Sequence, residues 1–461
     1  MTPRIGNTTI AAISTPPGAG GIGIIRISGD KARPILASIF QPKNSCRLQS
    51  HRLYYGHIRA PHGGRILDEV LAVYMAAPHT YTREDVVEIH CHGSFLVLQS
   101  ILELILTTGA VLADPGEFTK RAFLNGRIDL TQAEAVIDIL AAKTRKGVDL
   151  AQEQLSGALF RKIDPIRQSL IRVRAILEVA IDFPDEDVEI ANRAALIEQL
   201  EREVAGPLAN LLSRADAGRL YREGIAIVIA GLPNVGKSSL LNTILQEERA
   251  LVTAIPGTTR DSIEEVVDIM GVPVRIIDTA GIREDAGEVE ALGIRRAKEL
   301  INSADVVLFL LDGSREVSDG DRRLCAQLCH KPLIPVINKI DICEGSLPDL
   351  SSLPGIKGGV AISALMQKGI EELKQAIFSA VTSGREQWEE DGCAPNLRHK
   401  QALTAAGGAC AAALAALRSG LTNDLVAVDL QECLLCLSEI VGETTTEDIL
   451  DVIFQQFCLG K

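Results

Sequence analysis

One stretch of nine residues, Gly231–Ser239 (GLPNVGKSS), limits what this chain can fold into more than any other. Its two glycines let the backbone curl so that consecutive N–H groups point at phosphate oxygens. Lys237 would neutralise the β- and γ-phosphates, and the Ser238 hydroxyl would bind Mg²⁺. Because the stretch follows an apolar strand-like run, residues 224–230, and continues as a helix, it predicts an α/β fold around a phosphate-binding loop (P-loop).

Three further motifs follow in the order expected of a GTP-binding domain. Asp278–Gly281 (DTAG) comes after a strand-like run, where the aspartate can hold the Mg²⁺ shell and the glycine N–H can reach the γ-phosphate. Asn338–Asp341 (NKID) follows another apolar run, and Asp341 is placed to accept from the guanine ring nitrogen and exocyclic amine. Ser363–Leu365 (SAL) resembles the loop whose backbone contacts the guanine oxygen. The four motifs together predict binding of a guanine nucleotide.

The segment 253–261 (TAIPGTTRD) lies where the first switch segment of a GTPase belongs. Either Thr258 or Thr259 could reach Mg²⁺, and ordering of the segment by the γ-phosphate would couple nucleotide state to conformation. The motifs place these residues at the nucleotide: Asn234, Val235, Gly236, Lys237, Ser238, Ser239, Thr258, Thr259, Asp278, Thr279, Ala280, Gly281, Asn338, Lys339, Asp341, Ser363, Ala364 and Leu365.

Hydrolysis of GTP needs a group that orients the attacking water. Gly281 is followed by Ile282, whose aliphatic side chain cannot orient water by hydrogen bonding. The group must then come from the segment 283–290 (REDAGEVE). Spacing alone does not choose among its acidic residues, which are Glu284, Asp285, Glu288 and Glu290.

Hydrolysis also needs positive charge against the transition state, usually from an arginine finger. Arg283 and Arg260 are candidates for this role. Asn234, inside the P-loop, offers another solution, because its carbonyl oxygen can bind a monovalent cation such as K⁺ beside the phosphates.

The regions on either side of the nucleotide domain differ from it and from each other. Residues 1 to about 120 alternate strand-like and helical runs, which predicts a small α+β domain with a mostly antiparallel sheet. Residues from about 117 to 216, and again from about 385 onward, show helical spacing of apolar residues. Because the ends of a self-contained α/β unit usually lie close together, we expect it to be inserted into one helical domain made from both flanks.

The expected fold class is therefore multidomain, with an α+β N-terminal domain, an α-helical central domain and an inserted Ras-like α/β P-loop GTPase domain. The expected limits are 1–118 for the N-terminal domain, 119–216 for the first half of the helical domain, 217–382 for the G domain and 383–461 for the second half of the helical domain.

Composition restricts the partners and the compartment. The net charge of −13 argues against long-range, nonspecific capture of nucleic acid. No apolar run is long enough to span a membrane and no signal-like segment is present, so we expect a cytoplasmic protein. One local basic cluster would suit RNA phosphate or form a solvated helix face: Arg161, Lys162, Arg167, Arg172 and Arg174.

Motifs spread over the whole chain carry a more specific resemblance. They are Thr15–Gly18 with Gly23–Gly29, Tyr81–Asp85, Pro115–Thr119 with Arg121–Gly126, the nucleotide domain, and Phe457–Lys461. In this combination the chain resembles the MnmE (TrmE) family of tRNA-modification GTPases. The resemblance implies a folate-binding, dimer-forming N-terminal domain, a split helical domain and a G domain activated by K⁺-dependent dimerisation.

The resemblance also implies partners and a reaction. The partner is the FAD-dependent protein MnmG, which would join the homodimer in a heterotetramer or larger complex. Together such proteins install a carboxymethylaminomethyl-type group on carbon 5 of the wobble uridine of certain tRNAs. The one-carbon donor is a tetrahydrofolate derivative, in its 5-formyl or methylene form.

Residues carried over from the family complete the expected sites. Those around K⁺ are Asn234, Thr253, Ile255 and Thr258, with Thr253 also at the nucleotide, and those on Mg²⁺ are Ser238 and Thr259. The expected catalytic residues are Glu290, which orients water, Lys237 and Arg283. The expected folate contacts are Arg26, Glu88, Arg127 and Lys461. Arg127 stands where some members have lysine, which preserves charge but not geometry. Cys458 resembles the functionally important C-terminal cysteine of the family.

The alternative to a tRNA-modifying enzyme is a GTP switch used in ribosome assembly, which would share the G motifs and an RNA partner. Ribosome-assembly relatives usually append a KH-like RNA domain or a second G domain. Neither a Gly-x-x-Gly clamp in helical context nor a second P-loop is evident in this sequence. The enzyme is therefore the favoured hypothesis.

Overall fold

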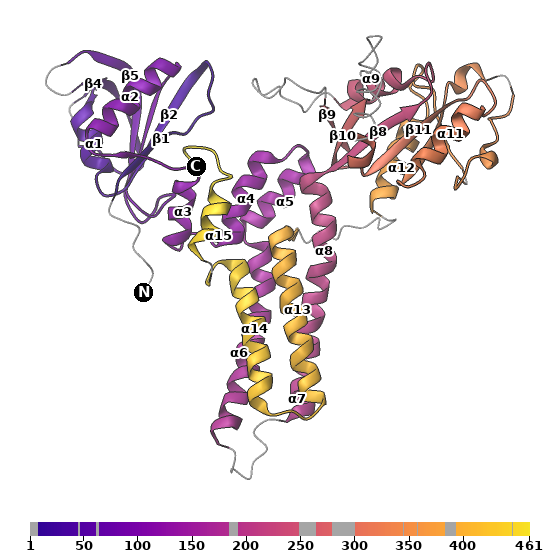
Figure 1. The fold of residues 1–461 in the computed structure, drawn as a ribbon. Coiled ribbons are helices and arrows are strands. Elements are labelled where there is room, and N and C mark those ends of the chain that lie inside the picture. Colours follow the sequence, from indigo (N-terminus) through magenta and orange to yellow (C-terminus); the bar gives the residue numbers. More distant parts are fainter. Residues whose placement is uncertain are drawn as a thin grey trace, which may run out of the picture. The chain divides into compact units, whose positions relative to one another are not determined.

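The structure is a computed structural model of the chain. It describes residues 8–44, 47–60, 64–183, 192–248, 264–278, 300–343, 345–356, 358–382, 393–444 and 446–461. The elements of the chain are labelled in Figure 1. They form two compact units, of which the first contains Met1–Ile137, Leu155–Pro184 and Asn423–Lys461, and the second contains Asp138–Gln154 and Asp185–Thr422. The fold class is the expected one, with an α+β N-terminal part, helices and a P-loop GTPase part.

The first unit begins with a seven-stranded sheet in the order β3-β4-β5-β6-β2-β1-β7. Its strands are β1 (Ile10–Ile13), β2 (Gly20–Ser28), β3 (Phe40–Pro42), β4 (Arg52–Arg59), β5 (Ile66–Met75), β6 (Val86–Gly93) and β7 (Val111–Leu112). Only the β1–β7 pair is parallel among these neighbours, which confirms a mostly antiparallel sheet.

One face of this sheet carries the core of the N-terminal part. Helices α1 (Ala32–Ile39) and α2 (Phe95–Thr107) share a buried cluster with Ile25 and Ile27 of β2 and Ile89 of β6. Because side chains alternate along a strand, Arg26 and Glu88 between these core positions point to the opposite face. The two charged residues are direct neighbours in the register of β2 and β6, so the sheet itself brings them together.

The remaining helices of the first unit come from distant parts of the chain. They are α3 (Glu117–Leu124), α4 (Leu130–Ala141, of which the last four residues belong to the second unit), α6 (Ala158–Asp182), α14 (Asn423–Val441) and α15 (Glu447–Phe454). Helices α4 and α15 bury apolar side chains together, among them Leu130 and Phe454, and α6 lies beside α14. Segments from both flanks of the nucleotide domain therefore pack in one unit.

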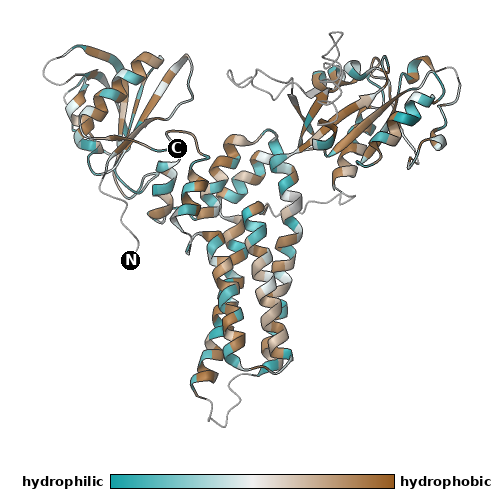
Figure 2. Cartoon of the chain, in the orientation of Figure 1, coloured by the Kyte–Doolittle hydropathy of each residue, from teal (hydrophilic) through white to brown (hydrophobic). Residues whose placement is uncertain are grey.

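The second unit contains a six-stranded sheet in the order β13-β12-β11-β8-β10-β9, parallel except for β9. Its strands are β8 (Ile225–Gly231), β9 (Glu264–Ile269), β10 (Val272–Asp278), β11 (Val306–Asp312), β12 (Leu333–Asn338) and β13 (Val360–Ala361). The central strands β8 and β11 are apolar and almost wholly buried, as parallel strands covered on both faces must be (Figure 2).

The helices of the second unit include three that accompany this sheet and four that lie outside it in sequence. The three that accompany the sheet are α9 (Lys237–Glu248), α11 (Asp319–Leu328) and α12 (Ile370–Thr382). The four outside it in sequence are α5 (Arg145–Leu155, of which the last residue belongs to the first unit), α7 (Arg193–Leu200), α8 (Gly206–Glu223) and α13 (Leu397–Arg418). Short turns η1 (Glu201–Ala205), η4 (Ile340–Ile342) and η5 (Leu350–Ser352) complete the described elements of this unit.

The predicted domain limits can be placed on these elements. The limit after residue 118 lies within α3, and the limit after residue 216 lies within α8. Residue 382 is the last residue of α12. The four-part division stays a prediction.

Among the residues that the structure describes, no helix combines the length and the apolar character needed to cross a membrane.

Candidate functional site

The P-loop joins the end of β8 to the start of α9, at the carboxyl edge of a parallel sheet, where α/β proteins bind ligands. Asn234 and Gly236 both have left-handed backbone conformations, with φ of 63° and 98°. A Cβ atom at Gly236 would lie 2.2 Å from Asn338 Nδ2, so this position requires glycine. Asparagine tolerates the left-handed region better than most residues, and the Asn234 side chain is exposed.

Lys237 lies inside the curl of this loop. Its Nζ donates to the carbonyl oxygens of Gly231, at 3.1 Å, and Leu232, at 3.0 Å. Ser238 and Ser239 follow at the exposed N-terminal end of α9. An ammonium, two hydroxyls and the positive end of a helix thus gather at one place, as phosphate with Mg²⁺ requires.

Asn338, the first residue of the NKID motif, ties three loops together. Its Nδ2 donates to the Val235 carbonyl of the P-loop at 2.9 Å, and its Oδ1 accepts from the Ala364 N–H at 3.0 Å. Only 2% of Asn338 is exposed. The geometry therefore gives Asn338 a positioning role between the phosphate end and the base end of the site.

The loop Ser363–Leu365 is held beside Asp341. The Ser363 hydroxyl donates to Asp341 Oδ1, and the Thr243 hydroxyl of α9 donates to the Ala364 carbonyl at 2.8 Å. Asp341 is exposed, and 80% of Leu365 is exposed. An oriented carboxylate thus faces solvent beside an exposed apolar side chain, an arrangement suited to a planar base with N–H donors.

Lys339 is held by an acidic partner that the sequence did not suggest. Its backbone is left-handed, with φ of 67°, and its Nζ donates to Asp312 Oδ2 at the end of β11 at 2.6 Å. Burial alone would raise the pKa of Asp312, but hydrogen bonds from Lys339 and Ser314 hold it below its usual value. The ion pair fixes the position of the Lys339 ammonium at the end of β11.

The rest of the predicted GTP site is only partly described. Asp278 is the last residue of β10, so it ends the strand beside β8 as expected of this motif. Several predicted residues lie outside the described residues: Thr253, Ile255, Thr258, Thr259, Arg260, Thr279, Ala280, Gly281, Arg283, Glu284, Asp285, Glu288 and Glu290. Their roles stay predictions.

A second cluster contains three of the predicted folate residues, and we name it the Tyr81 cluster: Arg26 and Glu88 on the N-terminal sheet, with Tyr81, Arg127 and Gly460 beside them. The Arg26 guanidinium bonds Glu88 Oε1 through Nε at 2.9 Å and Nη2 at 2.8 Å. The guanidinium carbons of Arg127 and Arg26 lie 4.7 Å and 5.8 Å from the centre of the Tyr81 ring. Two cations thus lie within reach of one aromatic ring.

The C-terminal segment Phe457–Lys461 completes this cluster. The Gly460 carbonyl accepts from Arg26 Nη1 at 3.3 Å and from the Ser14 hydroxyl at 3.1 Å. Gly460 has φ of 84°, and a Cβ atom there would lie 2.3 Å from the Ile13 carbonyl oxygen. Two predicted folate residues, Arg26 and Arg127, therefore meet at Tyr81, and a third, Glu88, is bonded to Arg26. Lys461 is next in the chain to Gly460. Cys458 is exposed.

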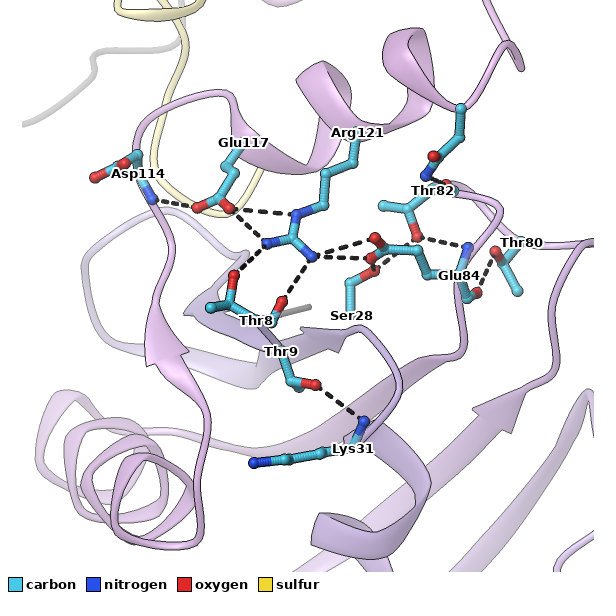
Figure 3. A network of polar contacts seen from close by, with 11 residues as sticks. Thr8, Thr9, Ser28, Lys31, Thr80, Thr82, Glu84, Asp114, Glu117 and Arg121 are labelled. Atoms are coloured by element: carbon cyan, nitrogen blue, oxygen red, sulfur yellow. Dashed lines mark hydrogen bonds and ion pairs between the residues drawn. The ribbon is translucent and has the colours of Figure 1, made fainter. Parts of the chain in front are cut away.

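A buried network fixes helix α3 to the sheet that carries this cluster (Figure 3). The Arg121 guanidinium, 1% exposed as a residue, bonds Glu117 Oε1 at 2.7 Å and Glu84 Oε2 at 3.1 Å, and donates to the Thr8 carbonyl at 2.9 Å. The Ser28 hydroxyl of β2 donates to the same Glu84 oxygen, Oε2, at 2.7 Å. The motifs around Glu84 and Glu117 therefore also have a structural role.

The basic cluster on α6 is not one solvated face. Arg167 is buried, with Glu443 after α14 as its ion-pair partner. Arg174 bonds Glu178 and Gln431. Arg161 and Arg172 are exposed. The solvated-face interpretation is therefore wrong for Arg167, which joins α6 to the end of α14.

Sequence reasoning missed several residues of both sites. It gave no role to Tyr81, Gly460, Asp312 or Thr243, although Tyr81 and Gly460 fall within motifs that it singled out. The position of Tyr81, next to polar residues within one of these motifs, could have indicated a role for it. Asp312 and Thr243 gave no local indication, because their partners lie 27 and 121 residues away.

Comparison with known proteins adds to this geometry. The family described as "MnmE helical domain" matches residues 130–458, and the family described as "GTP-binding protein TrmE N-terminus" matches residues 9–127. The chain is 60% identical over 461 residues to the tRNA modification GTPase MnmE of Desulfotalea psychrophila, covering 99% of this chain and 98% of that protein. It is 49% identical over 457 residues to the MnmE of Syntrophus aciditrophicus, covering 98% and 99%.

Proposed function

The chain belongs to the MnmE family of tRNA modification GTPases, and from this premise we propose that it modifies carbon 5 of the wobble uridine of certain tRNAs. The chain is thus a GTPase that acts on tRNA, and GTP is used with Mg²⁺. The proposed product is of the carboxymethylaminomethyl type. The proposed partners are a second copy of the chain and the FAD-dependent MnmG, in a heterotetramer or larger complex.

The Tyr81 cluster is the observation that carries the proposal of a tetrahydrofolate donor. A folate combines a flat pterin ring, whose edge carries N–H donors like that of guanine, with a carboxylate-bearing glutamate tail. Tyr81 offers a ring face, Glu88 offers carboxylate oxygens, and Arg127 with Lys461 offers positive charge. Bound there, a 5-formyl or methylene tetrahydrofolate would supply the one-carbon unit.

In this proposal Arg26 acts on the pterin through Glu88. Two hydrogen bonds from Arg26 fix the carboxylate of Glu88, and the Gly460 carbonyl fixes the guanidinium from the other side. The carboxylate is therefore already oriented before a ligand arrives, which lowers the entropy lost on binding. Cys458 lies two residues before Gly460, and we assign no chemical step to it.

For the GTP site we propose hydrolysis activated by K⁺. Asn234 supports this, because its exposed side chain projects from a left-handed position in the P-loop. The proposed remaining K⁺ residues are Thr253, Ile255 and Thr258, and the proposed Mg²⁺ residues are Ser238 and Thr259. Glu290 would orient water, while Lys237 and Arg283 would stabilise the charge on the phosphates.

Replacing Asn234 by glycine is expected to abolish the activation by K⁺. Glycine keeps the left-handed backbone without strain, so the P-loop stays intact while the carbonyl oxygen is removed. GTP hydrolysis in KCl and in NaCl should then proceed at the same rate, whereas the unchanged chain should be much faster in KCl. Affinity for GDP should stay within about twofold. A variant that still responds to K⁺ would remove Asn234 from the cation site.

Glu290→Gln is the matched control for this experiment. It keeps the size of the side chain and the cation site, but it removes the carboxylate that we propose for orienting water. Hydrolysis should fall by about a hundredfold in K⁺ and Na⁺ alike, with GTP affinity retained. Full turnover by this variant would move the role to another acidic residue of 283–290.

The proposed reaction is tested by nucleoside mass spectrometry of tRNA from cells lacking this protein. The modified wobble uridine should disappear, and the unchanged chain should restore it. Gly460→Ala should not restore it, because the new Cβ would meet the Ile13 carbonyl and displace the segment that reaches Arg26. Leu459→Ala, at an adjacent side chain that is 57% exposed, should restore it.

The outcomes of this experiment separate two parts of the proposal. An unchanged wobble uridine in the deletion strain would overturn the reaction. Full restoration by Gly460→Ala would leave the reaction standing but remove the C-terminal segment from the folate site. Circular dichroism melting of the purified variants identifies any that fail to fold.

A further inference from the structure

The first unit contains a pocket of about 450 Å³ that the proposed GTP site does not use. It is lined by the turns that begin α4 and α6 and by the turn that ends α14. This volume lies within the range of pockets that bind small molecules. Arg127 lines it as well as contacting Tyr81, so the pocket adjoins the Tyr81 cluster.

The lining combines apolar side chains with polar ones that differ in exposure. Phe123, Ile128 and Phe160 are half-buried, and Val441 is buried. The polar side chains at Arg127, Ser156, Arg161 and Glu443 are exposed. The less exposed lining therefore contains two aromatic rings together with the half-buried polar side chains of Asp129 and Gln132, and exposed charged groups lie at the mouth. Such a lining suits a flat ring.

The lining carries two guanidiniums, Arg127 and Arg161, and two carboxylates, Asp129 and Glu443, so anion binding depends on which groups are already engaged. Glu443 is paired with Arg167, and Asp129 accepts from the Thr131 hydroxyl at 2.6 Å and the Gln132 N–H at 2.9 Å. The hydrogen bonds described for Arg161 all go to Ser156, and the one described for Arg127 goes to the Tyr81 carbonyl. Each guanidinium has five N–H donors, so both have donors left for an anion.

We propose that this pocket binds one unstacked nucleotide of the tRNA substrate, with the base inside and its phosphate at Arg127 and Arg161. Proteins that read single-stranded RNA place splayed bases against aromatic rings and guanidinium planes. Enzymes that modify a base must also take it out of its stack. The inference rests on the proposed function, because a base held here would lie next to the proposed one-carbon carrier.

The folate tail is the competing occupant of the same pocket. Its glutamate would use the two guanidiniums, and its p-aminobenzoyl ring is the only part of it that could cover Phe123, Phe160 or Val441. Burying those side chains against a ring stabilises the complex in proportion to the apolar area removed from water. A nucleotide satisfies both the charged mouth and the aromatic lining.

Fluorescence anisotropy of the full chain with a fluorescein-labelled anticodon stem–loop RNA, bearing uridine at the first anticodon position, tests the proposal. Arg161→Gln removes one phosphate contact, and Ser156→Trp fills the pocket without changing charge. Each should weaken RNA binding about tenfold. Arg172→Gln removes the same charge from the same helix outside the pocket, and it should change binding by less than about twofold.

Three results would overturn the proposal. The first is RNA affinity unchanged in both pocket variants, confirmed as folded by circular dichroism. The second is an equal loss in Arg172→Gln, which would show nonspecific charge. The third is a loss of affinity for triglutamyl 5-formyltetrahydrofolate without a loss for RNA, which would make the occupant the folate tail. The nucleoside mass spectrometry described above tests the proposed reaction independently of this pocket.

Discussion

Asp341→Asn is expected to weaken GTP binding by about a hundredfold or more, because two hydrogen bonds from guanine to a charged acceptor are lost. The Ser363 hydroxyl can still donate to the new amide oxygen, which turns the new NH₂ group toward the base. Two donors would then face each other, the NH₂ group of the new side chain and the N–H groups of guanine. Xanthine has an exocyclic oxygen in place of the guanine amine, and this oxygen can accept from the NH₂ group. Isothermal titration calorimetry with GTP and with XTP should therefore show a reversed preference.

The control for this prediction is Asp349→Asn in the same part of the chain. Asp349 accepts from the N–H and the hydroxyl of Ser351, so it caps a local turn and has no described contact with the guanine-side loops. Its replacement should leave the preference for GTP over XTP unchanged. Tight GTP binding by Asp341→Asn would contradict the assignment of the base-reading carboxylate.

Arg121→Met is expected to destabilise the N-terminal part by about 3–5 kcal/mol, because it leaves the largely buried carboxylates of Glu84 and Glu117 without their common partner. Since the chain has several parts, a single unfolding transition is not a suitable measure. Hydrogen exchange followed by mass spectrometry locates the effect. Protection of amides in β1, β2 and β6 should fall, while protection in β8 and β11 should not change.

Lys120→Met, one residue earlier on α3, is the matched control. Lys120 pairs with Asp451, whose side chain is 54% exposed, and such surface pairs contribute about 0–1 kcal/mol. Its replacement should leave exchange in β1 and β2 nearly unchanged. Equal effects of the two substitutions would mean that the charge of α3 matters, and not the buried position of Arg121.

The positions of the described GTP-site motifs on the fold were largely predictable because each motif is local. The P-loop, Asp278, Asn338–Asp341 and Ser363–Leu365 all follow apolar strands, and a parallel sheet brings such strand ends to one edge. What spacing could not reveal is how the loops hold one another. The sequence predicts that Asn338 contacts the base. In the structure its side-chain amide connects Val235 of the P-loop, 103 residues away, to Ala364, 26 residues away.

Of the Tyr81 cluster, only Arg26, Glu88 and Arg127 were predicted, and only by resemblance. Arg26 and Glu88 are 62 residues apart, and nothing in their local sequence shows that β2 and β6 are neighbours. For Arg121, in contrast, the local sequence suggests an environment that differs from the one in the structure. An arginine in a helix with helical spacing is usually solvated, but the fold surrounds this one with two glutamates and a backbone carbonyl.

The bond between Arg26 and the Gly460 carbonyl spans 434 residues, and this bears on how the protein is made. The N-terminal sheet leaves the ribosome early, at a pace of about 5–20 residues per second, and its strands are close enough in sequence to pair at once. The Tyr81 cluster, however, stays open on one side until Gly460 has emerged. A nascent chain can therefore fold its first domain long before that domain acquires a complete binding site.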